Sequence, residues 1–411
     1  MRPDWKPRFS RTELVLLAIL LGVTTIVGTG IQMGNVLFPS LSRLLDVPLG
    51  TVTLLVSVWA FTGLLAPLFG PLSDRYGHGT FLLLGMGVFV LGNGLCAVAP
   101  SFPALLAFQV LVGLGYAVFG FSASAMVGDA FAYATRARAM GIVRLAVSAA
   151  ALAGVPAAAA IAEWGTPRAA FGTVAGLGLV LFIVALALLP RLTRQTAEAQ
   201  PVETKVNPWR AAAASVRQRS VLASLLAILG WAAIPTGTFI YLAAWLEQRF
   251  HFTDTRVGLA FSLVGVGALI GNVLTAALAD RLGKKRSAVL GLLVLSATTL
   301  LLPRLPGATA TMAALVVFTA ALEFSFGSFS TLLTELAPES RGTLMSLVSL
   351  ANGVGTGLVP LLMRPLWEGA GYRLITALLG GVGLGMAVIV GVFVAERQCA
   401  EPVLDKQSQV G

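Results

Sequence analysis

The chain has 411 residues, of which 57% are hydrophobic and only 11% are charged. Soluble domains carry charge on roughly a quarter of their residues, so this composition excludes an ordinary soluble protein and favours a membrane protein. The net charge of +10 does not indicate a nucleic-acid partner, because the Lys and Arg residues lie in short loops between apolar runs.

Apolar runs long enough to cross a bilayer, which takes about 20 residues, recur along the whole chain. We predict an all-α integral membrane protein of twelve transmembrane helices in two pseudo-symmetric six-helix bundles. The expected parts are an N-terminal bundle at 1–189, a cytoplasmic linker at 190–220, a C-terminal bundle at 221–396 and a cytoplasmic tail at 397–411. The expected spans lie near 13–37, 51–71, 80–99, 102–127, 139–162, 171–189, 221–246, 256–278, 287–303, 309–334, 342–363 and 372–394.

The distribution of positive charge predicts the orientation of these spans. Of the 28 Lys and Arg residues, twenty lie in the termini and the even-numbered connections and seven in the odd-numbered connections. Lys and Arg are retained on the cytoplasmic side of a membrane. We therefore predict a multi-pass protein of the cell inner (plasma) membrane with both termini and the central linker in the cytoplasm.

Groups that could support enzymatic chemistry are few. The predicted topology puts Cys96 and Cys399 on opposite sides of the membrane, which argues against a disulfide or a Cys-based metal site. His78 and His251 both lie in connections, and the sequence has no H-E-x-x-H, hydrolase nucleophile or phosphate-binding G-x-x-x-x-G-K-[ST] motif. We predict no enzyme, no catalytic residues, no cofactor and no metal.

An internal repeat supports the division into two halves. Gly70–His78, which follows the second span, matches Ala276–Lys284 after the eighth span at an offset of 206 residues. Asp129, which closes the fourth span, matches Glu335 at the end of the tenth at the same offset. Two matches at one spacing indicate parallel six-helix repeats, an arrangement found in transporters with the substrate site at the repeat interface.

The segments L-S-D-R-Y-G-H and L-A-D-R-L-G-K-K-R resemble the loop signature of the major facilitator superfamily, G-x-L-x-D-R-x-G-R-R, and the resemblance covers the entire chain. It implies transport by alternating access, with each loop aspartate facing the positive end of a helix dipole near Arg341 or Arg138. The alternative, that these charges only set the topology, explains neither the aspartates nor the glycines. The implied cytoplasmic gate comprises Gly70, Asp74, Arg75, Gly77, Asp129, Arg138, Asp280, Arg281, Gly283, Glu335 and Arg341.

The fifth span carries Ala153-Gly154-Val155-Pro156-Ala157, followed by Trp164-Gly165-Thr166-Pro167-Arg168-Ala169-Ala170-Phe171. This sequence is similar to the G-V-P-x-G and G-W-R-x-x-F pattern of bacterial exporters in the superfamily, including sugar-efflux and drug/proton antiporters. A proline inside a helix removes a hydrogen bond and can kink it, and small residues allow close packing. Helix packing alone is therefore an alternative explanation of the pattern.

Glu323 lies near the middle of the tenth span, with no charged residue within ten positions. Ionisable groups at membrane depth are costly and are functional candidates by default. We predict a proton-coupling role, with a hydrogen-bonded structural group or a direct substrate contact as alternatives. Many proton antiporters of the superfamily that this sequence resembles carry an arginine in the fourth span where this chain has Gln109. If that arginine is needed for coupling, coupling here would use Glu323 or be absent. Arg144 could partly substitute, but we expect it to snorkel or to pair with Asp129.

The resemblance implies that the first, fourth, seventh and tenth spans line a central cavity. Aromatic residues with a few hydrogen-bonding groups suit an amphipathic organic solute. We predict proton-coupled efflux of such a solute by a monomer, with the lipid bilayer, the substrate and protons as its partners. The alternatives are a proton symporter or facilitator for a polar nutrient such as a sugar and, more distantly, a non-transporting membrane sensor. The predicted cavity residues are Thr25, Thr29, Gln32, Gln109, Tyr116, Trp231, Thr238, Tyr241, Phe326 and Ser330.

Overall fold

The computed structural model describes residues 9–65, 69, 72–73, 75–131, 133–196, 219–336 and 341–394, except for the side chains of 133–134, 136–137, 190–196, 280, 334–336 and 341–346. All regular structure in these ranges is helical, as the sequence predicts. The N-terminal half contains α1 (Arg11–Leu45), α2 (Leu49–Val52), α3 (Leu54–Gly63), α5 (His78–Ala97), α6 (Phe102–Ala130), α7 (Tyr133–Ala149), the π-helix η1 (Ala150–Gly154), α8 (Val155–Trp164) and α9 (Pro167–Thr196). The C-terminal half contains α11 (Arg219–Phe250), α12 (Asp254–Leu282), α13 (Lys284–Leu301), the 3-10 helix η2 (Leu302–Arg304), α14 (Ala308–Leu336) and α15 (Arg341–Phe393).

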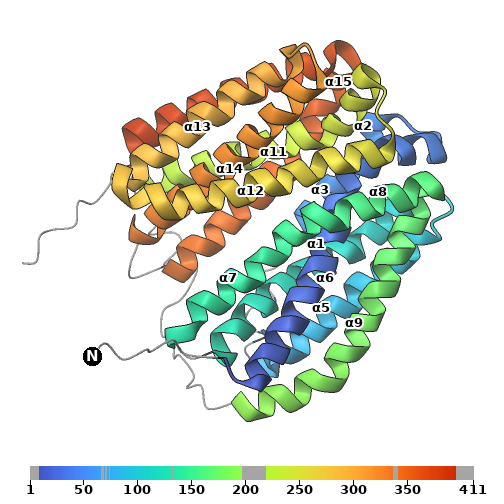
Figure 1. Cartoon of the computed structure of the whole chain (residues 1–411), viewed down its shortest axis with the longest axis vertical. Helices are drawn as coiled ribbons and strands as arrows, with labels where there is room; N and C mark the ends of the chain where they lie inside the picture. Colours follow the sequence, from blue (N-terminus) through green and yellow to red (C-terminus); the bar gives the residue numbers. More distant parts are fainter. Residues whose placement is uncertain are drawn as a thin grey trace, which may run out of the picture.

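The helices form two bundles that follow the two halves of the sequence. In Figure 1, α11 to α15 lie together as one bundle, and α1 and α5 to α9 lie together as the other. Within the bundles α5 packs against α6 and α9, and α11 packs against α15. Between the bundles α12 packs against α8 and η1, and α3 packs against α15. The predicted two-bundle fold is therefore confirmed.

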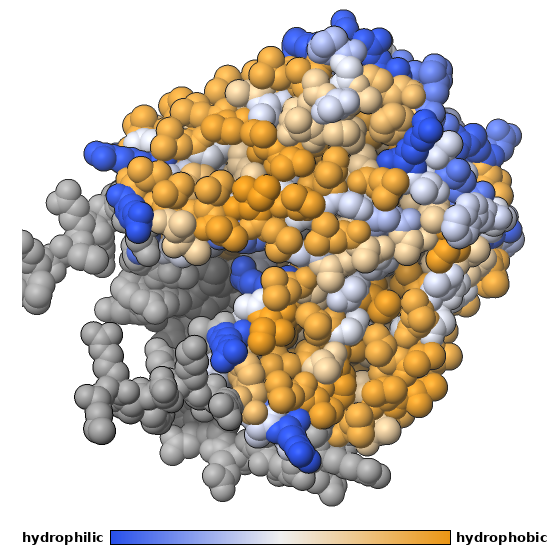
Figure 2. All heavy atoms as spheres, in the orientation of Figure 1, coloured by the Kyte–Doolittle hydropathy of each residue, from blue (hydrophilic) through white to orange (hydrophobic). Residues whose placement is uncertain are grey.

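The described helices also account for the predicted membrane spans. Ten helices in the described ranges are long and apolar enough to cross a membrane, and the shorter apolar stretch Leu49–Gly63 overlaps the second predicted span. Helix α15 contains the last two predicted spans, joined at Gly371, whose φ of 69° interrupts the helical geometry. Figure 2 shows hydrophobic residues over the middle of the visible face and hydrophilic residues toward the helix ends, as expected for a surface in contact with lipid.

Local sequence signals explain several helix ends. Ser10 and Glu13 form a reciprocal capping box at the start of α1, and Asp46 closes that helix in a left-handed conformation. The Thr253 side chain accepts a hydrogen bond from the backbone of Arg256 at the start of α12. The sixth span continues as helix α9 through Pro190 to Thr196, into the segment that we assigned to the linker.

The repeat at 206 residues is visible in the backbone. Gly77 and Gly283 occupy matching positions in the two halves and have almost the same conformation, with φ of 90° and 88°. Each precedes the first residue of a helix, α5 or α13. Only glycine adopts a positive φ without steric cost, so both predicted gate loops need glycine at this point for the chain to turn into the next span.

The G-V-P segment forms a close contact between helices. The π-helix η1 lies directly before Val155 and Pro156, where proline cannot donate a helical hydrogen bond. A Cβ atom on Gly154 would lie 1.9 Å from Thr29 Oγ1 of α1, and one on Gly258 of α12 would lie 2.6 Å from Ala159 Cβ. The small residues therefore bring α8 and η1 against both α1 and the opposite bundle.

Candidate functional site

A cavity of about 260 Å³ lies among α1, α6 and α7 of the N-terminal bundle. Two of the predicted substrate contacts, Gln32 and Tyr116, line it. The ring of Tyr116 is held edge-on against Trp59 of α3 at a centroid distance of 5.9 Å. The lining comprises Thr24, Val27, Gly28, Ile31, Gln32, Tyr116, Phe119, Gly120, Ala123, Ser124, Met140, Val143, Arg144 and Val147.

The other predicted residues of α1 and α6 do not line this cavity. Thr25 and Thr29 donate to carbonyl groups one turn earlier in α1, each at 2.8 Å, and Thr29 also packs against Gly154. Gln109 is buried and accepts a contact from the Cys96 thiol of α5 at 3.6 Å. Gln109 thus contributes to packing between α5 and α6.

The predicted residues of α11 and α14 divide into two groups. The Trp231 ring stacks on Phe326 at a centroid distance of 4.2 Å, and its indole N–H donates to Ser325 at 3.3 Å. Thr238 and Tyr241 are fully buried. Tyr241 stacks on Trp367 of α15, which makes it part of the aromatic packing between α11 and α15. Ser330 on α14 is half-buried.

Glu323 lies on the face of α14 that packs against α12. Its backbone passes close to Gly271, where a Cβ atom would lie 2.7 Å from Glu323 Cβ. Its carboxyl group interacts with the Asn272 side chain of α12 and, through charge, with Arg144 of the opposite bundle. The sequence did not predict this partner for Arg144. Of the two expectations for Arg144, snorkelling or a pair with Asp129, the ion pair does not occur in the described structure, where Asp129 lies 3.5 Å from His78 Nε2.

The structure describes part of the predicted gate. His78 connects Ser73, whose hydroxyl lies 2.8 Å from Nδ1, to Asp129 at the end of α6. Arg138 lies over the ring of Phe9, and Arg75 lies over that of Tyr76. Arg281 is exposed in the last turn of α12. Gly70 and Asp74, together with the side chains of Asp280, Glu335 and Arg341, lie outside the described parts of the chain.

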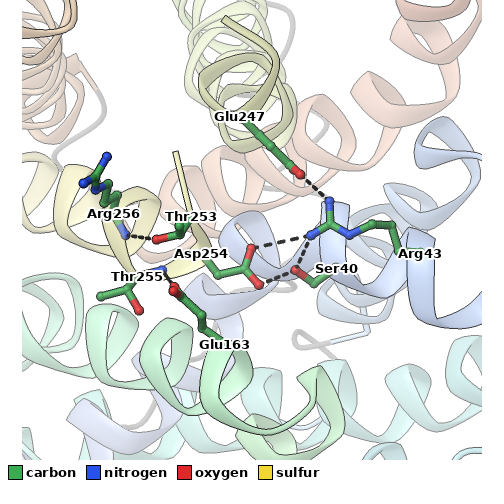
Figure 3. A network of polar contacts seen from close by, with 8 residues as sticks. All are labelled: Ser40, Arg43, Glu163, Glu247, Thr253, Asp254, Thr255 and Arg256. Carbon is green, nitrogen blue, oxygen red and sulfur yellow. Dashed lines mark hydrogen bonds and ion pairs between the residues drawn. The ribbon is translucent and has the colours of Figure 1, made fainter. Parts of the chain in front are cut away.

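A polar network at the opposite helix ends joins the two bundles (Figure 3). Arg43 of α1 forms an ion pair with Glu247 of α11 and lies 3.9 Å from Asp254 of α12. We call this network the clasp. Its other contacts are from Ser40 Oγ to Asp254, from Arg43 Nη2 to Ser40 Oγ at 3.1 Å, and from the Thr255 N–H to Glu163 Oε2 at 2.6 Å.

None of the clasp residues is among the site residues predicted from the sequence. Each lies at the end of a predicted span, and the predicted topology puts all of them on one side of the membrane, which was the available signal.

In the described ranges no group of three or more His, Cys, Asp or Glu side chains could hold a metal ion.

Comparison with known proteins identifies the family. A family model for the Major Facilitator Superfamily matches residues 20–253 and 232–409. The chain belongs to this superfamily. As a superfamily member it is a multi-pass membrane protein of a transport family, and its cavity lies in a transporter fold.

Individual relatives agree with this assignment. The chain is 30% identical over 385 residues to a chloramphenicol resistance protein of Streptomyces lividans, which covers 89% of this chain and 94% of that protein. It is 28% identical over 348 residues to the MFS-type transporter YceJ of Bacillus subtilis, covering 82% and 85% of the two chains. The fold is similar to that of a bacterial homologue of the human lysosomal transporter Spinster in an inward-facing, unoccupied conformation, with a TM-score of 0.70, 17% identity and coverage of 94% and 95%.

Proposed function

We propose that this protein exports small amphipathic organic solutes from the cytoplasm by alternating access, in exchange for protons. The observation that carries the proposal is its similarity, over 89% of its length, to a chloramphenicol resistance protein. The cavity supports it, because Val27, Ile31 and Phe119 offer apolar contact area while Gln32 and Tyr116 offer hydrogen bonds.

The clasp supports the alternating-access part of the proposal. It connects the bundles at one end of the molecule, whereas the glycine turns at Gly77 and Gly283 belong to the other end. With both termini in the cytoplasm, as the charge distribution predicts, the clasp lies on the outer side. The structure then represents a state that is closed to the outside, and export requires the clasp to break while the gate loops close.

Glu323 is the proposed proton carrier. It sits between α14 and α12 and interacts with Arg144 of the other bundle, so its surroundings change when the bundles move relative to each other. A carboxyl group whose charge partner and water access alternate between two states can release a proton in one and bind it in the other. Proton movement would thus be linked to the change of conformation.

An accumulation assay tests the proposal. Cells that lack their own drug exporters are loaded with radiolabelled chloramphenicol and with a panel of uncharged and acidic amphipathic compounds. Cells that express the protein should accumulate at least one compound less than cells with an empty vector, and a protonophore should abolish the difference. Equal accumulation of every compound would contradict export, and proton-dependent uptake of a sugar would favour the symporter instead.

A further inference from the structure

Arg144 places a charged group in the wall of the transport cavity. It lies on α7. The cavity is also lined by three apolar residues of the same helix, Met140, Val143 and Val147, which lie one, three or four positions from Arg144. A guanidinium group stays protonated at any physiological pH. The cavity therefore has a permanent positive charge on one wall, which the list of uncharged residues predicted from the sequence did not include.

This charge is not used in an ion pair of the described structure. Asp129, the carboxylate expected to pair with it, contacts His78 instead. The Arg144 side chain is exposed, and Glu323 acts on it through charge from the opposite bundle. Five guanidinium N–H donors on an exposed side chain are available to a ligand, and their planar arrangement suits a carboxylate.

The surroundings of Arg144 divide the cavity into a polar and an apolar part. Thr24, Gln32 and Tyr116 bring polar side chains to the cavity wall, and the buried Thr24 hydroxyl has no hydrogen-bond partner in the described structure. Val27 and Ile31 contribute apolar surface. A solute with an apolar body and one oxygen-rich end can satisfy both parts, whereas a hydrocarbon alone would leave the polar groups unpaired.

We propose that Arg144 is a specificity-determining residue that selects amphipathic carboxylates and rejects cationic amphipaths. The inference rests on the proposed function, because it names the class of solute that the exporter takes. A cationic solute would face the guanidinium directly. The lining residues of this cavity include no carboxylate that could offset the repulsion.

Three probes with one apolar body separate charge from shape. These are 1-naphthoate, the uncharged 1-naphthamide and the cation 1-naphthylmethylammonium, and their binding to the purified full-length protein is measured by isothermal titration calorimetry. The wild-type protein should bind 1-naphthoate about tenfold or more tightly than the ammonium. Arg144→Gln should lose this preference through weaker binding of 1-naphthoate, and Arg144→Lys should retain part of it.

Binding of 1-naphthamide reports whether the variant cavity is intact, and it should change less than threefold in Arg144→Gln. Arg286→Gln is the matched control, because it removes an exposed arginine of α13 that does not line the cavity. Unchanged 1-naphthoate binding by Arg144→Gln would overturn the proposal. Two results with the wild-type protein would also overturn it: equal binding of the three probes, or binding of none of them. The measurement needs no proton gradient, so failure of proton-driven export would leave its result standing.

Discussion

Arg43 on α1 and Glu247 on α11 form an ion pair that joins the N-terminal and C-terminal bundles. The two side chains are 57% and 36% exposed, and exposed ion pairs contribute only about 0.2 to 1 kcal/mol. Such a contact can favour one conformation without locking it. In the proposed transport cycle this is required of an outer gate, because the pair must break and form again in every turnover.

Removal of this pair should favour the state that is open at the clasp. We expect Arg43→Gln to increase the population of that state by up to about fivefold, which corresponds to the upper value for an exposed pair. The measurement is a double electron–electron resonance distance between spin labels at Trp164→Cys and Leu259→Cys, two exposed positions on α8 and α12.

A double-mutant cycle identifies the pair as the cause. In the Arg43→Gln background, Glu247→Gln should raise the open population less than it does in the wild-type protein, because both changes remove the same contact. Arg373→Gln, which removes an exposed arginine with no ion pair in the described structure, should leave the distance distribution unchanged. Fully additive effects of Arg43→Gln and Glu247→Gln would show that the two side chains act independently.

Glu163 should also stabilise the state in which the clasp is closed, by a different contact. Its carboxylate accepts a hydrogen bond from the backbone N–H of Thr255, in the first turn of α12 in the other bundle. Glu163→Ala removes the acceptor and should raise the open population by about two- to tenfold, in the range of helix-capping contacts. Glu163→Gln keeps an acceptor and should have a smaller effect. A larger shift for Gln than for Ala in the same resonance experiment would refute this assignment.

Gly115 should be essential for stability. A Cβ atom there would lie 2.4 Å from the Phe89 backbone nitrogen of α5, so the two helices would have to separate. We expect Gly115→Ala to destabilise the protein by about 1 to 3 kcal/mol, visible as a lower melting temperature of the purified protein. Gly128→Ala lies on the same helix with no atom within 4 Å of the new methyl group and should change the melting temperature little.

The apolar runs and the repeat were sufficient to predict the fold, because length and hydrophobicity alone decide whether a helix can span a bilayer. Which residues line the cavity depends on the rotation of each helix about its axis, and the apolar runs and the repeat do not determine that rotation. Thr25 and Thr29 were expected to line it, yet the lining face of α1 carries Thr24 and Gly28. One residue is 100° of rotation on a helix, and the identical side chains of Thr24 and Thr25 gave no basis for choosing between them.

Pairs that join the bundles were harder still to predict. Arg43 and Glu247 are 204 residues apart, and their contact depends on how two complete bundles dock. Arg144 could have been noticed, because it is a single charge inside an apolar run. The sequence left open whether it snorkels or pairs with Asp129, and in the structure Asp129 contacts His78 at the start of α5.

The two ends of the bundles should lie on opposite sides of the membrane. In a variant without native cysteines, a membrane-impermeant maleimide added to intact cells should label Trp164→Cys, at the clasp end of α8. It should label Arg281→Cys, at the last turn of α12, only after the cells are made permeable. Labelling of Arg281→Cys in intact cells would reverse the proposed orientation and put the clasp in the cytoplasm.

Glu323 is the proposed link between protons and solute, and its replacement should separate binding from energy coupling. Glu323→Gln keeps the size and the hydrogen-bonding capacity of the side chain toward Asn272 of α12 but cannot release a proton. In proteoliposomes we expect at least a tenfold loss of proton-driven transport. Exchange of labelled for unlabelled solute without a gradient should continue, because it needs only the conformational change.

Asn272→Ala provides the comparison within the same contact. It removes the side-chain amide beside Glu323 and leaves the carboxyl group in place, so proton-driven transport should fall less than in Glu323→Gln. If Glu323 acted only through its contact with Asn272, the order would reverse, because Gln keeps a polar side chain for this contact and Asn272→Ala removes it. The ratio of driven transport to exchange in the two variants therefore distinguishes a proton carrier from a structural role.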